Sequence, residues 1–239
     1  MAYRYKALAS DYDDTLGERG LVPPETLAAL SKFQNSARRL ILVTGRELPD
    51  LKAVFPHLHL FDRVVAENGG VLYRPDTGKK QVLAAPPNAS FVKALKARGV
   101  RPLAVGDVIV ATRQPNEDIV LGAIRDLGLE LQITFNKSSV MVLPSGVNKL
   151  SGLRVALHDL DLSEHEVVGV GDAENDHAFL GDCGFSVAVR NALPSIKEMA
   201  DLTTRGNRGA GVAELIDLIL RDALAPPKMK ADCNGETRV

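Results

Sequence analysis

The sequence predicts an α/β protein in which a doubly wound, Rossmann-like parallel sheet forms the core and a small α+β unit is inserted into it. Three observations support this fold class. Continuous apolar segments, typical of buried parallel strands, alternate with helical segments near the start of the chain and again after residue 148. Residues 81–146 instead contain neighbouring strand-like segments. The 239 residues suffice for one large domain or two small ones.

The first half of the core is expected to begin with a strand at Tyr5–Ser10. A loop and a helix starting near Pro24 follow, because proline lacks the N–H group that a first helical turn leaves unpaired. Arg39–Val43 ends in a continuous apolar run and is predicted to be a buried strand. A short helix at Pro49–Val54 and a strand at Phe61–Ala66 complete this half.

The second half repeats the alternation of helix and strand. Its expected elements are Lys149–Leu157 (helix), Glu166–Val170 (strand), Asn175–Leu180 (helix), Phe185–Val189 (strand) and Pro194–Ala200 (helix). A last helix has apolar residues at helical spacing, namely Val212, Leu215, Ile216, Ile219 and Leu220. This alternation predicts a parallel sheet that is covered by helices on both faces.

The inserted unit has the order helix, strand, helix and two adjacent strands. Its expected elements are Ser90–Ala97, Asp107–Thr112, Glu117–Leu127, Glu130–Thr134 and Val140–Leu143. The polar sequence that starts at Asn136 favours a hairpin turn between the last two strands. We expect a core of residues 1–80 and 147–224, an insert of residues 81–146, and a disordered tail at 225–239, which lacks apolar periodicity.

The composition excludes several classes of protein. The 29 basic and 30 acidic residues give a net charge of -1, which argues against a dedicated nucleic-acid or anionic-membrane surface. The longest apolar runs are strand-sized, well below the roughly 18 residues of a membrane span. Arg4 and Lys6 interrupt the N-terminus, unlike a secretory signal, and two cysteines do not make a disulfide framework. We expect a cytoplasmic monomer or homodimer without nucleic-acid or membrane partners.

Three carboxylates, Asp11, Asp13 and Asp14, directly follow the first predicted strand. They repel one another unless a cation neutralises them, and a hard divalent cation such as Mg²⁺ prefers oxygen ligands. A solvated acidic loop that precedes the next helix is the alternative interpretation. The position at the end of a buried strand favours the metal, since ligands bind at the carboxyl ends of strands in doubly wound sheets.

Groups suited to phosphate follow the second strand and begin the helix at residue 149. The segment Thr44, Gly45 and Arg46 offers a hydroxyl, a glycine that permits close backbone approach, and free N–H groups. Lys149 is expected at a helix start, where the positive end of the helix dipole disfavours a cation unless an anion lies nearby. Taken singly, a simple turn and an exposed lysine are the simpler explanations.

A second acidic loop, led by Gly171, follows the strand at Glu166–Val170. It contains Asp172, Asn175 and Asp176. Helix capping explains such residues when they occur alone. Together with the other three segments, however, they supply a metal site and positive donors around one tetrahedral phosphate.

In this order, the four segments resemble the signatures of the haloacid dehalogenase superfamily of phosphohydrolases. The matching residues are Asp11, Asp13, Thr15, Thr44, Lys149, Asp172, Asn175 and Asp176. Many members of that family have glycine where this chain has Asp14. Aspartate tolerates unusual backbone angles, so the loop is expected to survive, but the role of the extra carboxylate stays open.

The spacing of the motifs resembles one branch of that family, type IIB. Thr44 lies 33 positions after Asp11, which leaves no room for an inserted domain, whereas Lys149 lies 105 positions after Thr44. The insert is therefore similar to the α+β cap domain of phosphatases for sugar and organic phosphates, such as phosphoglycolate and sucrose-phosphate phosphatases. The sequence from Glu67 to Gly70 also resembles a turn typical of that branch.

The resemblance implies a role for each site residue. Asp11 would be the nucleophile that forms an aspartyl-phosphate, and Asp13 would be the general acid and base. The implied Mg²⁺ ligands are Asp11, Asp13 (through its backbone carbonyl), Asp172 and Asp176. Contacts to the substrate are expected from Thr44, Gly45, Arg46, Lys149 and Asn175.

The substrate is expected to be a small phosphorylated metabolite. In the insert, Arg101, Arg113 and Lys137 are candidates for contact with its distal group, although solvated surface charges are the simpler explanation. Two other functions use a similar set of aspartate, threonine and lysine. These are a phosphoacceptor switch domain, which does not turn over, and a phosphotransferase.

Overall fold

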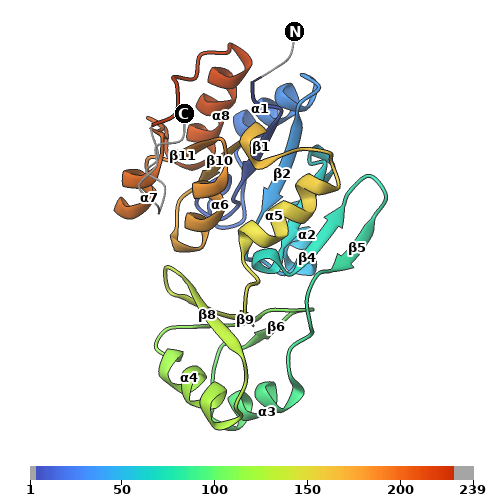
Figure 1. Ribbon diagram of the computed structural model, residues 1–239, viewed down its shortest axis with the longest axis vertical. Helices are drawn as coiled ribbons and strands as arrows, with labels where there is room; N and C mark the ends of the chain where they lie inside the picture. The colour runs from blue at the N-terminus through green and yellow to red at the C-terminus, as the bar shows by residue number, and fades with distance from the viewer. Residues whose placement is uncertain (1–3, 229–239) are drawn as a thin grey trace.

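The computed structural model describes residues 4–228, which form a larger core and a smaller unit beside it (Figure 1). The smaller unit, called the cap from here on, comprises the elements from α3 to β9. Most of the predicted tail lies outside the described residues, and residues 225–228 have no helix or strand. No helix within residues 4–228 is long and apolar enough to cross a membrane.

An eight-stranded sheet forms the core, in the spatial order β12-β11-β10-β1-β2-β3-β4-β5. The six strands from β12 to β3 are parallel, and β4 and β5 are antiparallel to their neighbours. The strands are β1 (Ala7–Ser10), β2 (Arg39–Val43), β3 (Arg63–Ala66), β4 (Val71–Arg74), β5 (Lys79–Val82), β10 (Val167–Gly171), β11 (Phe185–Ala188) and β12 (Leu202–Thr203). The central strands β1, β2 and β10 are almost wholly buried, which explains their continuous apolar sequences.

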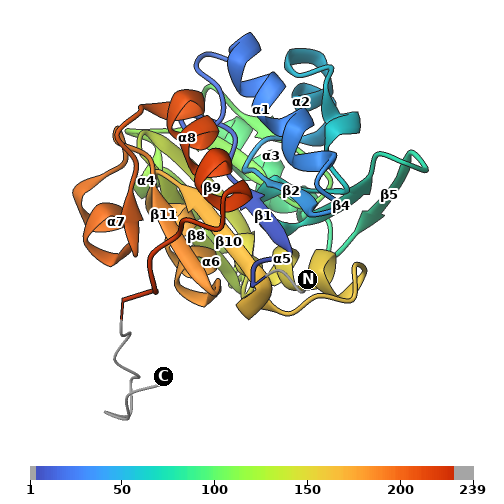
Figure 2. The same cartoon turned by 90° about the horizontal axis from the view of Figure 1, so that it is seen from above.

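Helices cover both faces of this sheet, as expected for a doubly wound fold. Figure 2 shows α1 (Pro24–Gln34), α2 (Leu48–Val54) and α8 (Arg208–Leu220) on one face, and α5 (Lys149–His158) and α6 (His177–Asp182) on the other. The remaining core helix, α7 (Pro194–Met199), follows β11. Apolar residues of α8 at the predicted spacing are buried, among them Val212, Leu215 and Ile216. The predicted fold class is confirmed.

The cap has a separate antiparallel sheet of four strands in the order β6-β7-β9-β8. Its elements are α3 (Ala89–Ala97), β6 (Ala104–Val105), β7 (Val110–Arg113), α4 (Glu117–Asp126), β8 (Leu131–Asn136) and β9 (Ser139–Pro144). The sheet faces the core and the two helices lie on its far side (Figure 1). Between sheet and helices the cap buries its own apolar cluster, which includes Phe91, Leu95, Val110, Val120 and Val142.

Four strands, β4, β5, β6 and β12, were not predicted, and one predicted cap strand starts later than expected. The hairpin β4–β5 was not predicted, because β5 has the polar, wholly exposed sequence Lys79–Val82 and therefore no apolar pattern. The glycine-containing turn before it was the available signal. The cap strand expected at Asp107–Thr112 begins only at Val110, because the backbone N–H groups of residues 107–109 donate to the buried carboxylate of Glu67 instead.

A close contact between two backbone segments positions the start of α5. Gly69 has φ +106°, and a Cβ atom on it would lie 1.9 Å from the carbonyl oxygen of Asn148. Asn148 is the N-cap of α5, and its side chain accepts a hydrogen bond from the N–H of Ser151. Only glycine permits this approach, which holds the start of α5, and with it Lys149, against the turn that follows β3.

We predict that Gly69→Ala lowers the free energy of unfolding by about 3 kcal/mol, because the methyl group adds a backbone clash to the strain of positive φ. Gly78→Ala is the matched control. Gly78 also has positive φ, +68°, but no atom lies within 4 Å of the added methyl group. The control should cost about 1 kcal/mol. Urea unfolding measures both values, and equal losses would contradict the role assigned to Gly69.

Candidate active site

The four predicted segments meet at one edge of the core sheet. Asp11 follows β1, Thr44 follows β2, and Asp172 follows β10, so the carboxyl ends of three adjacent parallel strands present them together. Lys149 reaches the same place from the first turn of α5. The cap sheet faces this region of the core (Figure 1).

At the centre of the site, a buried lysine pairs with two of three clustered, buried carboxylates. Lys149 Nζ lies 2.5 Å from Asp11 Oδ1 and 2.6 Å from Asp176 Oδ1, and the Lys149 side chain is 0% exposed. Asp11, Asp172 and Asp176 each offer an oxygen within 4.8 Å of the others. A cation at a helix start is unfavourable alone, and these carboxylates provide the compensating negative charge.

Burial and the neighbouring charges shift the pKa values of Asp11, Asp172 and Lys149. Burial raises the pKa of Asp11 well above its usual range, opposed by Lys149 and reinforced by Asp176 and Asp172. Burial and the neighbouring Asp176 likewise raise the pKa of Asp172. Burial by itself would lower the pKa of Lys149, but Asp11 and Asp176 raise it overall. The site therefore has a deficit of positive charge, which a further cation would relieve.

The three aspartates fit a divalent cation. Their donor atoms are all carboxylate oxygens, the ligands that Mg²⁺ prefers. Asp172 Oδ2 is buried and pairs with Lys137 Nζ of the cap at 2.7 Å. The other oxygen of Asp172 accepts a hydrogen bond from Thr15 Oγ1 at 3.1 Å, which fixes the carboxylate orientation.

Asp176 organises the loop that carries Asp172. Asp176 Oδ2 accepts hydrogen bonds from the backbone N–H groups of Asp172 at 2.8 Å and Ala173 at 3.0 Å. The helix predicted at Asn175–Leu180 begins here with a short 3-10 turn, Glu174–Asp176, before α6. One Asp176 oxygen thus holds its own loop while the other contacts Lys149.

The side chain of Asp13 lies outside the carboxylate cluster. Arg46 donates to both Asp13 oxygens, through Nε at 2.8 Å and Nη2 at 2.7 Å, and also pairs with Asp50 at 2.6 Å. Although burial opposes it, the Asp13 carboxylate raises the pKa of Arg46. A fork of this kind fixes the carboxylate in one orientation, with both groups lining the same cavity.

The remaining predicted contacts are also found at this edge. Thr44 is buried, and its hydroxyl accepts a hydrogen bond from the backbone N–H of Arg46 at 3.2 Å. Gly45 lines the cavity. Asn175 donates to Asn68 Oδ1 at 3.0 Å, and within residues 4–228 the buried Asn175 Oδ1 and Asn68 Nδ2 have no hydrogen-bond partner.

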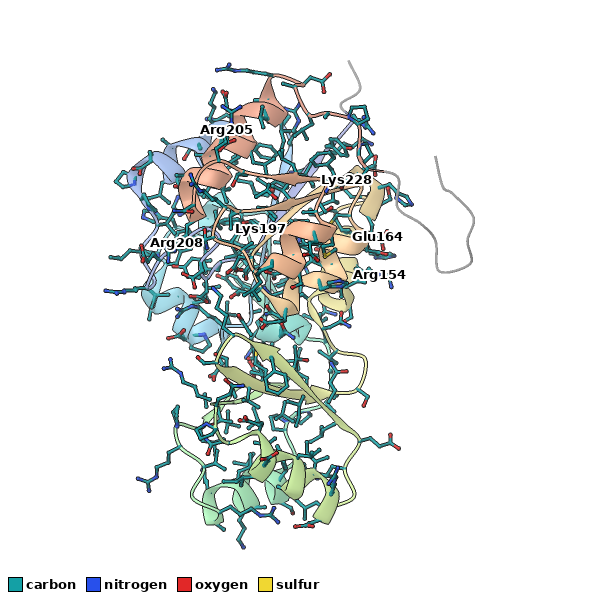
Figure 3. The ribbon with its side chains drawn as sticks, turned by 90° about the vertical axis from the view of Figure 1, so that its left-hand side faces the viewer. Arg154, Glu164, Lys197, Arg205, Arg208 and Lys228 are labelled. Carbon is teal, nitrogen blue, oxygen red and sulfur yellow. The ribbon has the colours of Figure 1, made fainter. Side chains whose placement is uncertain are left out.

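Asp14, whose role the sequence left open, connects the core to the cap. It has φ 58°, and its carboxylate accepts hydrogen bonds from Lys137 Nζ at 2.6 Å and Arg208 Nε at 3.0 Å. Arg208 is the first residue of α8, on the flank of the core shown in Figure 3. Burial opposes the shift, yet these two cations hold the pKa of Asp14 below its ordinary value. Lys137 is the turn residue between β8 and β9.

Glu67 is a second connection to the cap, and sequence reasoning missed it. This fully buried carboxylate accepts from the backbone N–H groups of Asp107, Val108 and Ile109 at 2.8–3.0 Å. The available sequence signal is the glycine-rich turn from Glu67 to Gly70. Glu67 fixes one side of the cap, and Lys137 contacts the core at the other.

A cavity of about 420 Å³ lies between the core and the inner face of the cap sheet. Core residues Asp13, Asp14, Gly45 and Arg46 line one side of it. The cap contributes Ala111, Arg113, Asn136, Lys137, Ser138, Ser139 and Met141. Of the three charged cap residues expected near a ligand, Arg113 and Lys137 line this cavity, whereas Arg101 does not.

The family model and the relatives that match this chain agree with each other. A sequence model of the haloacid dehalogenase-like hydrolases matches residues 8–98 and 104–216. The phosphoglycolate phosphatase of Methanothermobacter thermautotrophicus is 33% identical over 218 residues, with 88% of this chain and 97% of the relative covered. Phosphoglycolate phosphatase 2 of Saccharolobus solfataricus is 29% identical, with 89% and 91% covered.

Solved structures share the fold at lower identity. A haloacid dehalogenase-like hydrolase from Bacteroides thetaiotaomicron superposes with a TM-score of 0.75 at 18% identity, covering 90% of this chain and 99% of the other. A sugar phosphatase described as subclass IIB gives 0.74 at 18% identity, with 92% and 100% covered. These similarities confirm a core of this fold with an inserted cap.

We predict that Mg²⁺ stabilises the protein through Asp172. A ligand at a hundred times its Kd adds about 2.7 kcal/mol, which corresponds to a Tm increase of roughly 5–10 °C for a chain of this size. In Asp172→Asn the increase should fall below about 2 °C, because a buried anionic ligand is lost. Asp126→Asn, at an exposed position of the cap, is the control. Thermal unfolding with Mg²⁺ and with chelator measures the shift, and an unchanged shift in Asp172→Asn would refute the assignment.

Proposed function

The chain belongs to the haloacid dehalogenase-like hydrolases, and from this we propose that it is a Mg²⁺-dependent phosphatase of a small organic or sugar phosphate, acting through an aspartyl-phosphate. The observation that carries this proposal is the buried Asp11 carboxylate, held by Lys149 beside two further carboxylates at the end of β1. The names of the relatives, phosphoglycolate phosphatases at about 30% identity, support a phosphomonoester substrate.

In the first half-reaction, an oxygen of Asp11 attacks phosphorus and forms a P–O bond. The bond between phosphorus and the ester oxygen breaks, and Asp13 gives a proton to the departing alkoxide. Asp13 lies outside the buried cluster and lines the cavity, and one of its two oxygens has to leave the pairing with Arg46 to carry this proton. The alcohol leaves and the phosphoryl group stays on Asp11.

In the second half-reaction, Asp13 takes a proton from water while the water oxygen attacks phosphorus. The bond to Asp11 breaks, which releases inorganic phosphate and restores the free carboxylate. Asp11 thus serves as nucleophile and then as leaving group, and Asp13 returns to its starting protonation state. Atoms and protons balance over the two steps.

The groups around Asp11 stabilise the negative charge that develops on the phosphoryl oxygens. Lys149 places a permanent positive charge where the phosphoryl oxygens gather negative charge, and the buried Thr44 hydroxyl is a further donor at the end of β2. Asp11, Asp172 and Asp176, together with the Asp13 backbone carbonyl, would hold Mg²⁺. When bound, the ion supplies electrostatic stabilisation of the phosphoryl oxygens.

We predict that Asp11→Asn lowers the rate of phosphate release at least about a thousandfold, because the amide is not a competent nucleophile at phosphorus. The side chain keeps its size, so circular dichroism should match the wild type. Asp217→Asn, an exposed carboxylate on α8, is the control and should keep full activity.

The assay follows steady release of phosphate from p-nitrophenyl phosphate and from a panel of sugar and organic phosphates, with Mg²⁺ and with chelator. Wild-type turnover by Asp11→Asn would exclude the nucleophile assignment. Phosphorylation of the wild type without turnover would instead favour a phosphoacceptor switch, and transfer to a second alcohol would favour a phosphotransferase.

A further inference from the structure

The inner face of the cap sheet carries one cation that has no ionic partner among residues 4–228. Three cations line the cavity, namely Arg46, Lys137 and Arg113. Arg46 is paired with Asp13 and Asp50, and Lys137 with Asp14 and Asp172. The Arg113 side chain has no hydrogen bond or ion pair with any residue in the range 4–228.

We propose that Arg113 is a specificity-determining residue that binds a carboxylate on the substrate, so that the preferred substrates are small phosphomonoesters with a carboxylate rather than neutral sugar phosphates. This inference rests on the proposed phosphatase function, because it assigns the distal part of the same site. It explains why an unpaired guanidinium faces a cavity whose other cations are already neutralised.

The strand register places Arg113 on the cavity side of the cap sheet. Arg113 in β7 is paired with Ser139 in β9, and Ala111 is paired with Met141, so all four side chains project from one face. Met141 identifies that face, because its sulfur would lie 3.1 Å from a Cβ atom placed on Gly45 of the core.

The intervening residue confirms the alternation. Thr112 is buried, and its hydroxyl donates to the carbonyl oxygen of Pro102 inside the cap. Side chains one position apart in a strand point to opposite faces, so Arg113 is directed away from the cap's apolar cluster. The Arg113 side chain is exposed and is not part of the packed interior of the cap.

The chemistry of the cavity selects a second anion. A guanidinium presents parallel N–H donors that match both oxygens of a carboxylate, and charge-assisted pairs of this kind are stronger than neutral hydrogen bonds. Ser138, Ser139 and Asn136 add hydroxyl and amide groups to the lining of the same cavity, and its carboxylates, Asp13 and Asp14, are already paired. A ligand whose phosphoryl group lies near Asp13 and Gly45 would extend its other end towards Arg113 across this cavity.

The test compares two substrates that differ only at the distal group. Phosphoglycolate carries a carboxylate, and 2-hydroxyethyl phosphate carries a hydroxymethyl group in its place. For Arg113→Gln we expect kcat/KM for phosphoglycolate to fall about 10- to 100-fold relative to wild type, while the value for 2-hydroxyethyl phosphate changes less than about threefold. Arg113→Lys keeps the charge but loses the fork, and should give an intermediate loss.

Arg101→Gln is the matched control, since Arg101 is a cap arginine that does not line the cavity. It should leave both substrates unaffected. Equal losses on the two substrates for Arg113→Gln, or no loss on either, would overturn the carboxylate assignment. Urea unfolding of Arg113→Gln should match the wild type, because the side chain has no structural partner in the described chain.

A binding measurement separates this proposal from the proposed function. Calorimetry gives the Kd of phosphoglycolate for Asp11→Asn and for the double variant that also carries Arg113→Gln, neither of which needs to turn over. We expect Kd to be at least tenfold weaker in the double variant. An unchanged Kd would overturn the role of Arg113, whereas absence of wild-type hydrolysis with this difference in Kd intact would overturn only the phosphatase function.

Discussion

A lysine ammonium buried between two carboxylates is the interaction on which the rest of the structure depends. Lys149 has no solvent exposure, and it contacts Asp11 and Asp176, which come from β1 and from the loop after β10. An isolated buried charge would cost many kcal/mol, so the ammonium is tolerable only if both carboxylates are in place. The register of β1 against β10, the start of α5 and the close approach of Gly69 to Asn148 all serve this contact.

Lys149 neutralises only part of the negative charge in the site, and a cation from the cap neutralises a further part. Three carboxylates, Asp11, Asp172 and Asp176, face one buried lysine, and the second cation in contact is Lys137 at the tip of the β8–β9 hairpin. Lys137 also pairs with Asp14. Asp14 therefore has a structural role. It attracts the cap tip to the core, while the uncharged N–H donors around Glu67 fix the opposite side of the cap.

Local patterns predicted most of the fold and the core of the site. Continuous apolar runs identified β1, β2 and β10, and strand ends identified Asp11, Thr44 and Asp172, because carboxyl ends of parallel strands share one edge. Contacts made by tertiary packing alone were not predictable in this way. Lys137 and Asp14 are separated by 123 positions, and Glu67 binds backbone groups that have no side-chain signature. The edge strand β5 was missed because an exposed strand has no apolar periodicity.

The side chains of the site are positioned in different ways in the core and in the cap. This difference determines which part of the site can vary with the substrate. In the core, the reacting groups stand at strand ends and helix starts, where backbone geometry and buried charge pairs constrain them together. In the cap, the cavity residues Ala111, Arg113, Ser139 and Met141 are set only by the alternation of side chains along β7 and β9. A substitution on that inner face changes the cavity chemistry without entering the cap's apolar cluster. Discrimination among phosphomonoesters can therefore vary in the cap while the buried charges around Asp11 stay unchanged.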